Sequence, residues 1–217
     1  MTLHQRTLFG GGEPAIHDRA HLERIHLDAQ SWVDVAREWL HGADDLLDTL
    51  VASVEWQQGR RWMYERMVDD PRLSRWFPAG EPLPHPVMAE VKRALESRYG
   101  VRFGSVGLNY YRDGDDSVAW HADRELRELE DTRIAILTLG ARRPFLIRPK
   151  GRGRSRDLAP ASGDLLVMGG STQMGWEHAV PKVRHAGPRI SCSWRWMRKP
   201  DGTEADQSRR RPVQTRR

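Results

Sequence analysis

The segment SVGLNYYRDGDDSVAWHAD, residues 105–123, contains two extended runs separated by a turn signal. Residues 105–111 form the first run, the dipeptide Asp113-Gly114 is typical of a tight turn, and residues 117–120 lead into His121. The pattern predicts a β-hairpin whose second strand leads to two side chains of types that can bind metals, His121 and Asp123.

A third metal-binding side chain follows 57 residues later (178 − 121), at His178. In an extended chain residues i and i+2 point to the same face, so His121 and Asp123 can reach one cation, and the intervening strands can bring His178 beside them. A His-x-Asp pair alone is common by chance. Two imidazoles and one carboxylate on one face of a metal leave positions open for a bidentate co-substrate and dioxygen, the arrangement of non-haem iron oxygenases.

Short aliphatic runs after this segment, at residues 133–140, 144–147 and 164–168, predict further strands. In the last run, residues 189–196, alternation places Arg189, Ser191, Ser193 and Arg195 on one face and apolar side chains on the other. Inside a β-barrel such a face needs an anionic guest. The alternative is an outward, solvated charged face.

Residues 108–196 resemble the catalytic core of the AlkB family of iron(II)- and 2-oxoglutarate-dependent dioxygenases. The matching features are the Asn109-Tyr110-Tyr111 run, the segment at residues 121–125, the Gly-Gly end of residues 164–170, His178, and the pair Arg189 and Arg195. The combination is far more specific than any one part. Residues 31–107 match the nucleotide lid region of the family only loosely.

The resemblance implies a metal site formed by His121, Asp123 and His178, and a 2-oxoglutarate site formed by Asn109, Tyr111, Arg189, Ser191 and Arg195. Arg189 would pair with the far carboxylate, helped by the Tyr111 hydroxyl, because a guanidinium matches a carboxylate bidentately. Arg195 would lie near the iron-chelating carboxylate. Ser191 stands where the family commonly has Asn, and a shorter side chain would need a water bridge.

The resemblance also implies contacts with a nucleic-acid base. Glu125 resembles an acidic residue that accepts a hydrogen bond from the exocyclic amino group; the alternative is one more solvated charge in an acidic stretch. Residues 54–78 mix aromatic side chains with arginines, which suits a lid over a nucleotide. Trp76 or Phe77 is the candidate for stacking on the base, and the alternative is that these aromatics pack helices against the sheet.

Positive charge is concentrated in one segment of the chain. The formal net charge is +5, but residues 141–156 alone contain seven Lys or Arg and no acidic residue. Such a cluster suits contacts with phosphates, and we expect Arg148 and Arg152 to be among them. The alternative is a solvated loop.

These observations predict an α+β, mainly β protein with a double-stranded β-helix (jelly-roll) core, flanking N-terminal helices and a nucleotide-recognition lid. We expect a flexible arm at residues 1–20, one dioxygenase domain at 21–200 with the lid at about 54–80 and the core at about 101–197, and a disordered basic tail at 201–217. Helices are expected at residues 31–40, 43–54 and 86–98. Neither a signal peptide nor a long apolar segment is visible, which predicts a cytoplasmic protein.

The expected function is oxidative demethylation of bases such as 1-methyladenine and 3-methylcytosine in DNA, with RNA as a further substrate, releasing formaldehyde and succinate. Fe(II), 2-oxoglutarate and dioxygen are the expected cofactor and co-substrates, and nucleic acid is the expected partner, with no membrane and no obligate protein partner. Two alternatives remain: a 2-oxoglutarate-dependent hydroxylase or demethylase of a protein or small molecule, and a non-catalytic nucleic-acid-binding jelly roll.

Overall fold

The structure, a computed structural model, describes residues 11–63, 65–151 and 153–197. Its larger sheet has eight strands in the order β2 (Leu22–His26), β3 (Ser31–Ala36), β12 (Leu165–Gly170), β9 (Thr132–Gly140), β14 (Arg189–Met197), β7 (Val106–Tyr111), β6 (Arg66–Phe77) and β5 (Gln57–Met63). The smaller sheet has four, in the order β11 (Arg156–Asp157), β10 (Leu146–Pro149), β13 (Trp176–Val180) and β8 (Val118–His121). All the pairings are antiparallel.

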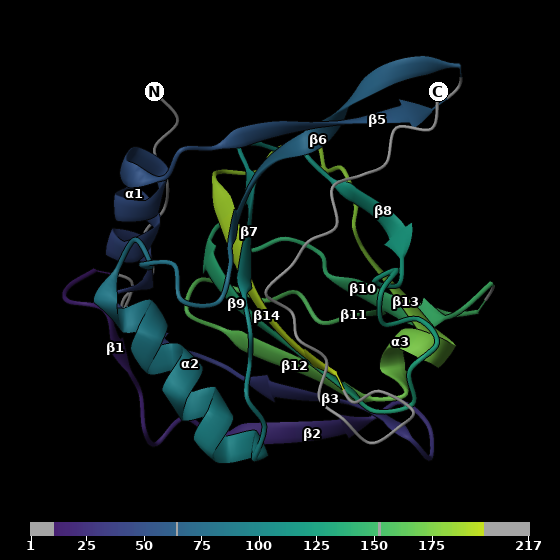
Figure 1. The fold of residues 1–217 in the computed structure, drawn as a ribbon, viewed down its shortest axis with the longest axis horizontal. Coiled ribbons are helices and arrows are strands. Elements are labelled where there is room, and N and C mark those ends of the chain that lie inside the picture. The colour runs from purple at the N-terminus through teal and green to yellow at the C-terminus, as the bar shows by residue number, and fades with distance from the viewer. Residues whose placement is uncertain (1–10, 64, 152, 198–217) are drawn as a thin grey trace.

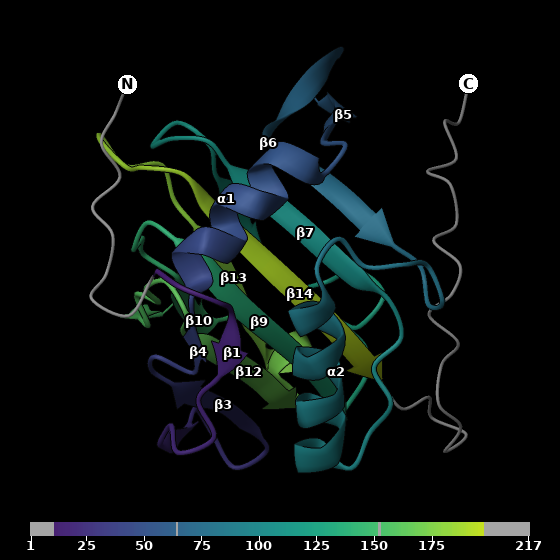
Figure 2. The ribbon, with the colours of Figure 1, turned by 90° about the vertical axis from the view of Figure 1, so that its left-hand side faces the viewer.

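One face of the larger sheet packs against two helices, α1 (Ala43–Ser53) and α2 (Pro86–Tyr99), as Figure 2 shows. Alternate side chains of the strands, among them Leu137 of β9 and Val167 of β12, join Leu46 and Leu95 of the helices in one buried cluster. Both helices agree with the sequence prediction. Gly100 ends α2 in the left-handed conformation at φ +64°, which explains why this helix stops before its glycine.

The other face of the larger sheet meets the smaller sheet. Ile134 and Ile136 of β9 alternate with the helix-facing residues and join Ile147 of β10 and Val180 of β13 in a second buried cluster. Two sheets that face each other across such a core confirm the predicted jelly roll, and Figure 1 shows β8 and β13 on one side and β7 and β14 on the other. The hairpin β5–β6 extends the larger sheet at the top of this view.

The predicted helix at residues 31–40 is wrong, because residues 31–36 form strand β3 between β2 and β12. Apolar residues in this segment fit a helical spacing, but Val33 and Val35 also alternate as in a strand, and pairing with two neighbours decides the outcome. Asp34 is 1% exposed on the opposite face, where it accepts hydrogen bonds from Arg24 at 2.6 and 2.8 Å and from the Tyr99 hydroxyl at 2.9 Å.

The predicted hairpin at residues 105–121 is also wrong in its pairing. Both strands exist, but β7 lies between β6 and β14 in the larger sheet, whereas β8 pairs with β13 in the smaller sheet. Residues 112–117 therefore cross from one sheet to the other. A turn signal in sequence specifies a change of direction, and the sheet that receives the second strand is set by tertiary packing.

The chain ends differ in part from expectation. Within the predicted N-terminal arm, Ala15–Ile16 form β1 and pair with β4 (Leu40–His41). Residues 1–10 and the predicted basic tail at 201–217 lie outside the described residues. Among the described helices, none combines the length and the apolar character needed to cross a membrane.

Cys192, the one cysteine of the chain, lies on the helix-facing side of β14 and is fully buried. Burial raises the pKa of its thiol to about 12. The side chain therefore behaves as a small apolar core residue, as expected from its place in the alternating pattern of residues 189–196.

Gly169 offers a test of the register between β12 and β3. It pairs with Trp32, and a Cβ at this position would lie 2.1 Å from Cζ2 of that ring. Gly169→Ala should therefore lower the free energy of unfolding by about 1–3 kcal/mol, measured by urea denaturation, because the indole must be displaced. Gly175→Ala is the matched control, since its Cβ would meet nothing within 4 Å. Equal stability of the two variants would contradict the close approach of Trp32 to Gly169.

Candidate metal centre and co-substrate pocket

Three side chains meet between the two sheets. His121 at the end of β8 and His178 in β13 are direct cross-strand partners, and their ring centroids lie 4.3 Å apart. Asp123 follows two residues after the end of β8. One potential ligand atom from each of these residues lies within 4.8 Å of the other two, so a single divalent cation could be held by all three.

The two imidazoles are oriented for binding. Nδ1 of His121 lies 2.9 Å from the carbonyl oxygen of Ala119, so it can donate its hydrogen there and leave Nε2 free as a metal ligand. His178 is 7% exposed and stacks on Phe145, with ring centroids 5.5 Å apart. Burial, assisted by His121, lowers the pKa of His178 to about 3, so its ring is neutral at physiological pH, the form that binds metals.

Asp123 connects the metal cluster to the larger sheet. Burial alone would raise the pKa of this carboxyl, but the positive charge of Arg195 in β14, with His178 and His121, lowers it to about 2. Nε of Arg195 donates to Oδ2 of Asp123 at 2.6 Å, and Oδ1 lies 3.6 Å from Nε2 of His121. One carboxylate oxygen thus faces the guanidinium and the other faces the cluster.

Arg189 is a fully buried cation on the same face of β14 as Arg195. Its Nη2 donates to Oγ1 of Thr138 at 3.3 Å, whereas Nε and Nη1 are buried without a hydrogen-bond partner. Burial lowers its pKa to about 10, which still leaves it charged at neutral pH. No carboxylate of the described residues lies within ion-pair distance of Arg189. A buried guanidinium with two unsatisfied nitrogens fits a carboxylate guest, because a carboxylate can accept from both nitrogens and its charge would offset the desolvation of the guanidinium.

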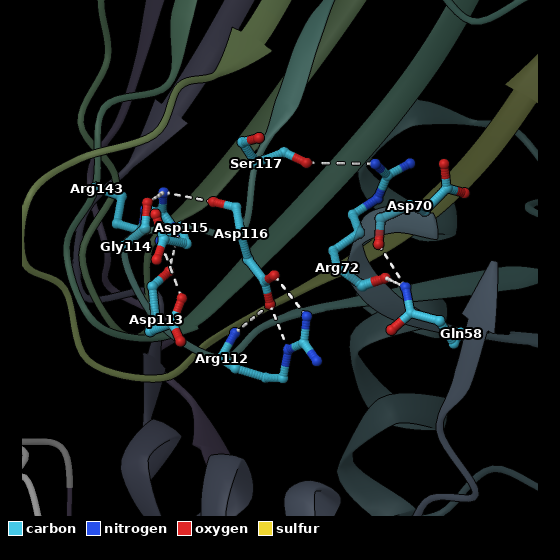
Figure 3. A network of polar contacts seen from close by, with 10 residues as sticks. All are labelled: Gln58, Asp70, Arg72, Arg112, Asp113, Gly114, Asp115, Asp116, Ser117 and Arg143. Carbon is cyan, nitrogen blue, oxygen red and sulfur yellow. Dashed lines mark hydrogen bonds and ion pairs between the residues drawn. The ribbon is translucent and has the colours of Figure 1, made fainter. Parts of the chain in front are cut away.

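Tyr111 lies between two buried guanidinium groups. The centroid of its ring is 5.3 Å from Cζ of Arg189 and 5.5 Å from Cζ of Arg143. Arg143 is 1% exposed and donates to the carbonyl oxygens of Asp113 at 2.8 Å, Asp116 at 2.8 Å and Pro181 at 2.9 Å. Figure 3 shows how it secures the crossing between β7 and β8. This arginine of the basic segment is therefore structural.

Asn109 and Ser191 are cross-strand partners on the site-facing side of β7 and β14. Oδ1 of Asn109 accepts a hydrogen bond from Nε of Arg72 at 3.0 Å, and the same guanidinium approaches the carbonyl oxygen of Ser117 at 3.4 Å (Figure 3). Because Oδ1 is engaged, the amide nitrogen of Asn109 is the group left to donate to a guest. Sequence patterns gave no signal for Arg72, because its partner is distant in the chain.

Trp76 and Phe77, the two residues predicted to stack on a base, point to opposite faces of the larger sheet. Trp76 pairs with Gly107, and a Cβ at Gly107 would lie 3.2 Å from the Trp76 ring and 3.5 Å from Nη1 of Arg195. The indole thus lies over the glycine on the site-facing side of the larger sheet. Phe77 points to the helix-facing core and is 6% exposed. The prediction of Phe77 as a base-stacking residue is therefore wrong, since neighbouring strand residues face opposite ways.

The basic segment at residues 141–156 divides into two groups. Arg148 lies over the Trp120 ring at 3.9 Å and forms an ion pair with Glu177 at 2.6 Å, on the face of the smaller sheet opposite to the two histidines. This placement differs from the expected phosphate contact, because its charge is already engaged. Arg152 lies outside the described residues.

The second group is exposed. Lys150, Arg154 and Arg156 form no ion pair with another described residue, and the two arginines line a groove of about 510 Å³ together with Leu27, Ser155 and Trp176.

Glu125, the residue predicted to contact the base, is exposed in the turn that follows Asp123. It forms no ion pair within the described part of the chain.

Removal of one imidazole tests the cluster. We expect His178→Ala to abolish tight Mn²⁺ binding, measured by electron paramagnetic resonance of the free ion, because two ligands remain of three. His185→Ala, at an exposed histidine outside the cluster, should bind Mn²⁺ like the unaltered protein. Circular dichroism would verify folding of both variants. Wild-type affinity in a folded His178→Ala protein would exclude this residue as a ligand.

The comparisons with known proteins agree with this geometry. Residues 46–211 match the model of the 2OG-Fe(II) oxygenase superfamily. The chain is 33% identical over 211 residues to the alpha-ketoglutarate-dependent dioxygenase alkB homolog 3 of Homo sapiens, covering 84% of this chain and 73% of that protein. It is 35% identical over 133 residues to the DNA oxidative demethylase ALKBH2 of Arabidopsis thaliana, covering 48% and 42%.

A solved structure described as that of OsALKBH1 shares the fold, with a TM-score of 0.57 and 13% identity over 80% of this chain and 99% of that chain. Iron, 2-oxoglutarate and dioxygen are the cofactor and co-substrates of the matched superfamily, and the two histidines, the aspartate and the buried guanidinium fit the first two. The chain therefore belongs to the AlkB family of iron(II)- and 2-oxoglutarate-dependent dioxygenases.

Proposed function

We propose that this chain oxidatively demethylates N-alkylated bases in nucleic acid. The observation that carries the proposal is the joint presence, between the same two sheets, of a His-Asp-His cluster and a buried arginine without a carboxylate partner. The similarity to proteins named DNA oxidative demethylase ALKBH2 and alkB homolog 3 supports nucleic acid as the substrate class. Similarity of fold alone would not support this substrate class, because proteins of one fold act on many different substrates.

His121, Asp123 and His178 would hold the iron. When bound, iron with 2-oxoglutarate and dioxygen supplies the oxidant for an N-methyl group, so that succinate, carbon dioxide and formaldehyde are released. What the chain contributes is placement. Arg195 holds the carboxylate of Asp123, and the hydrogen bond from His121 to Ala119 fixes the ligating nitrogen.

Arg189 would bind the far carboxylate of 2-oxoglutarate through Nε and Nη1, with the Tyr111 hydroxyl beside it. The desolvation cost of this guanidinium is already present in the free protein, where Arg189 is fully buried, so a bound carboxylate would gain a strong charge-assisted contact. Asn109 would donate its amide hydrogen, and Ser191 would contact the co-substrate through water. Together these groups orient the co-substrate and exclude bulk solvent.

The methylated base would lie between the cluster and the lid. Trp76 offers a ring face over Gly107, close to Arg195, and stacking on such a face is worth about 1–3 kcal/mol per base. Glu125, exposed in the turn after Asp123, would accept a hydrogen bond from the exocyclic amino group. A carboxylate here also favours lesions that carry positive charge, such as 1-methyladenine and 3-methylcytosine.

The flanking strand would run along the groove that contains Arg154 and Arg156. These two cations form no ion pair with another described residue, whereas Arg143 and Arg148 are held within the protein. Neutralised phosphates release counterions, so this groove would make binding dependent on salt.

The proposed activity is tested with a single-stranded oligonucleotide that contains 3-methylcytosine, supplied with Fe(II), 2-oxoglutarate and dioxygen. We expect formaldehyde and succinate in equal amounts, demethylated product by mass spectrometry, and no demethylation by His121→Ala. An unmodified oligonucleotide is the control for uncoupled turnover. Succinate without demethylation in every methylated oligonucleotide would instead favour a protein or small-molecule substrate, and no turnover would favour a non-catalytic binder.

The groove is tested by the salt dependence of oligonucleotide binding. The double variant Arg154→Gln, Arg156→Gln should flatten the slope of log K against log salt concentration by roughly 0.7 for each lost phosphate contact. Arg93→Gln is the matched control, because Arg93 is exposed on α2, which covers the opposite face of the larger sheet. Equal slopes for the double variant and wild type would place the strand elsewhere.

A further inference from the structure

Asp123 is held in place by side-chain contacts and not by strand pairing. The last cross-strand pair of β8 joins His121 to His178, and the chain leaves the sheet before it reaches Asp123. Strand geometry therefore fixes the first histidine but cannot fix the carboxylate. The backbone carbonyl of Asp123 accepts a hydrogen bond from the Leu126 N–H at 2.9 Å, which shapes the following turn without connecting it to the rest of the site.

The backbone N–H of Asp123 has a partner far away in the sequence. It donates to Oε1 of Gln173 at 2.8 Å. Gln173 belongs to α3 (Thr172–Gly175), is 1% exposed, and has its amide nitrogen 4.0 Å from the sulfur of Met168. The orientation of this amide is therefore set on both sides, with the oxygen toward Asp123 and the nitrogen toward the core.

Gln173 lies close in the chain to the second histidine of the cluster. Helix α3 leads directly into β13, which carries His178. A single side chain thus connects the segment of the carboxylate ligand to the segment of the second imidazole. The ion pair with Arg195 fixes the carboxylate end of Asp123, and the Gln173 bond fixes the peptide from which that side chain projects.

We propose that Gln173 is a positioning residue of the metal site, which fixes the peptide of Asp123 relative to His178 and so sets the distance between these two ligands. The inference rests on the proposed metal ligands and is independent of the nucleic-acid substrate. Groups that orient metal ligands typically contribute 10–100-fold to metal affinity or activity. Here the oriented group is a peptide rather than a ligand side chain.

The test measures Mn²⁺ affinity of the full chain by electron paramagnetic resonance, without co-substrate or nucleic acid. Gln173→Met keeps the length of the side chain and removes the acceptor, and we expect it to weaken Mn²⁺ binding by roughly 10–100-fold. Met174→Leu on the same short helix is the matched control, because Met174 is 38% exposed, and it should bind like wild type. Circular dichroism and thermal unfolding without metal report folding separately.

Two further variants keep the inference falsifiable. Gln173→Glu retains the acceptor and adds negative charge, so it should bind Mn²⁺ at least as tightly as wild type; binding as weak as that of Gln173→Met would overturn the inference. If Gln173→Met does not fold, Gln173→Asn, which is too short to reach, replaces it with the same expectation. Wild-type affinity in a folded variant without the acceptor overturns the role of Gln173 alone, whereas a wild-type protein that binds no Mn²⁺ overturns the metal site itself.

Discussion

The ion pair between Arg195 and Asp123 joins the two sheets at the site, and the arrangement of the cluster depends on it. The histidines come from neighbouring strands of the smaller sheet, so their separation follows from strand register. The aspartate lies beyond that register, and its carboxylate is oriented by a guanidinium from the larger sheet. A displacement of one sheet against the other would therefore move one ligand relative to the other two.

The second constraint is the concentration of buried positive charge behind the cluster. Arg189 and Arg143 are both almost fully buried, on two sides of Tyr111. Both Nη atoms of Arg143 donate to backbone carbonyl oxygens, which leaves its Nε without a partner, whereas Arg189 keeps both Nε and Nη1 without partners. The same residue type thus has two roles around one tyrosine ring: Arg143 secures a loop, and Arg189 has the free donors to bind an anion. The hydrogen bonds of the two side chains distinguish these roles.

Much of this arrangement could be predicted from sequence, because the information is periodic. The alternation of residues 189–196 placed Arg189 and Arg195 opposite Ile190 and Cys192, and the structure confirms it. The ligand trio was predicted from residue type and spacing, and the structure brings it together. Residues 31–36 could not be assigned in this way, because their apolar side chains satisfy both periods and only pairing with β12 selects the strand.

Sequence was least informative for contacts between distant segments. Gln173, Arg72 and Thr138 act on their partners through tertiary hydrogen bonds, for which a single chain carries no local pattern. The basic segment at residues 141–156 shows the same limit, because charge counting treats its arginines as equivalent, whereas Arg143 is buried and Arg154 is exposed. Charge counting also cannot tell which way a side chain points, and Arg148 faces away from the site.

The burial of Cys192 has a consequence for an enzyme that handles iron and dioxygen. Damage by peroxide begins at a thiolate that solvent can reach, and proceeds through sulfenic to irreversible sulfinic acid. Because the thiol of Cys192 is protonated and enclosed on the far side of β14, the protein presents no reactive cysteine to stray oxidants. Inactivation during uncoupled turnover would then fall on the iron site or on Met and Trp side chains near it, rather than on cysteine.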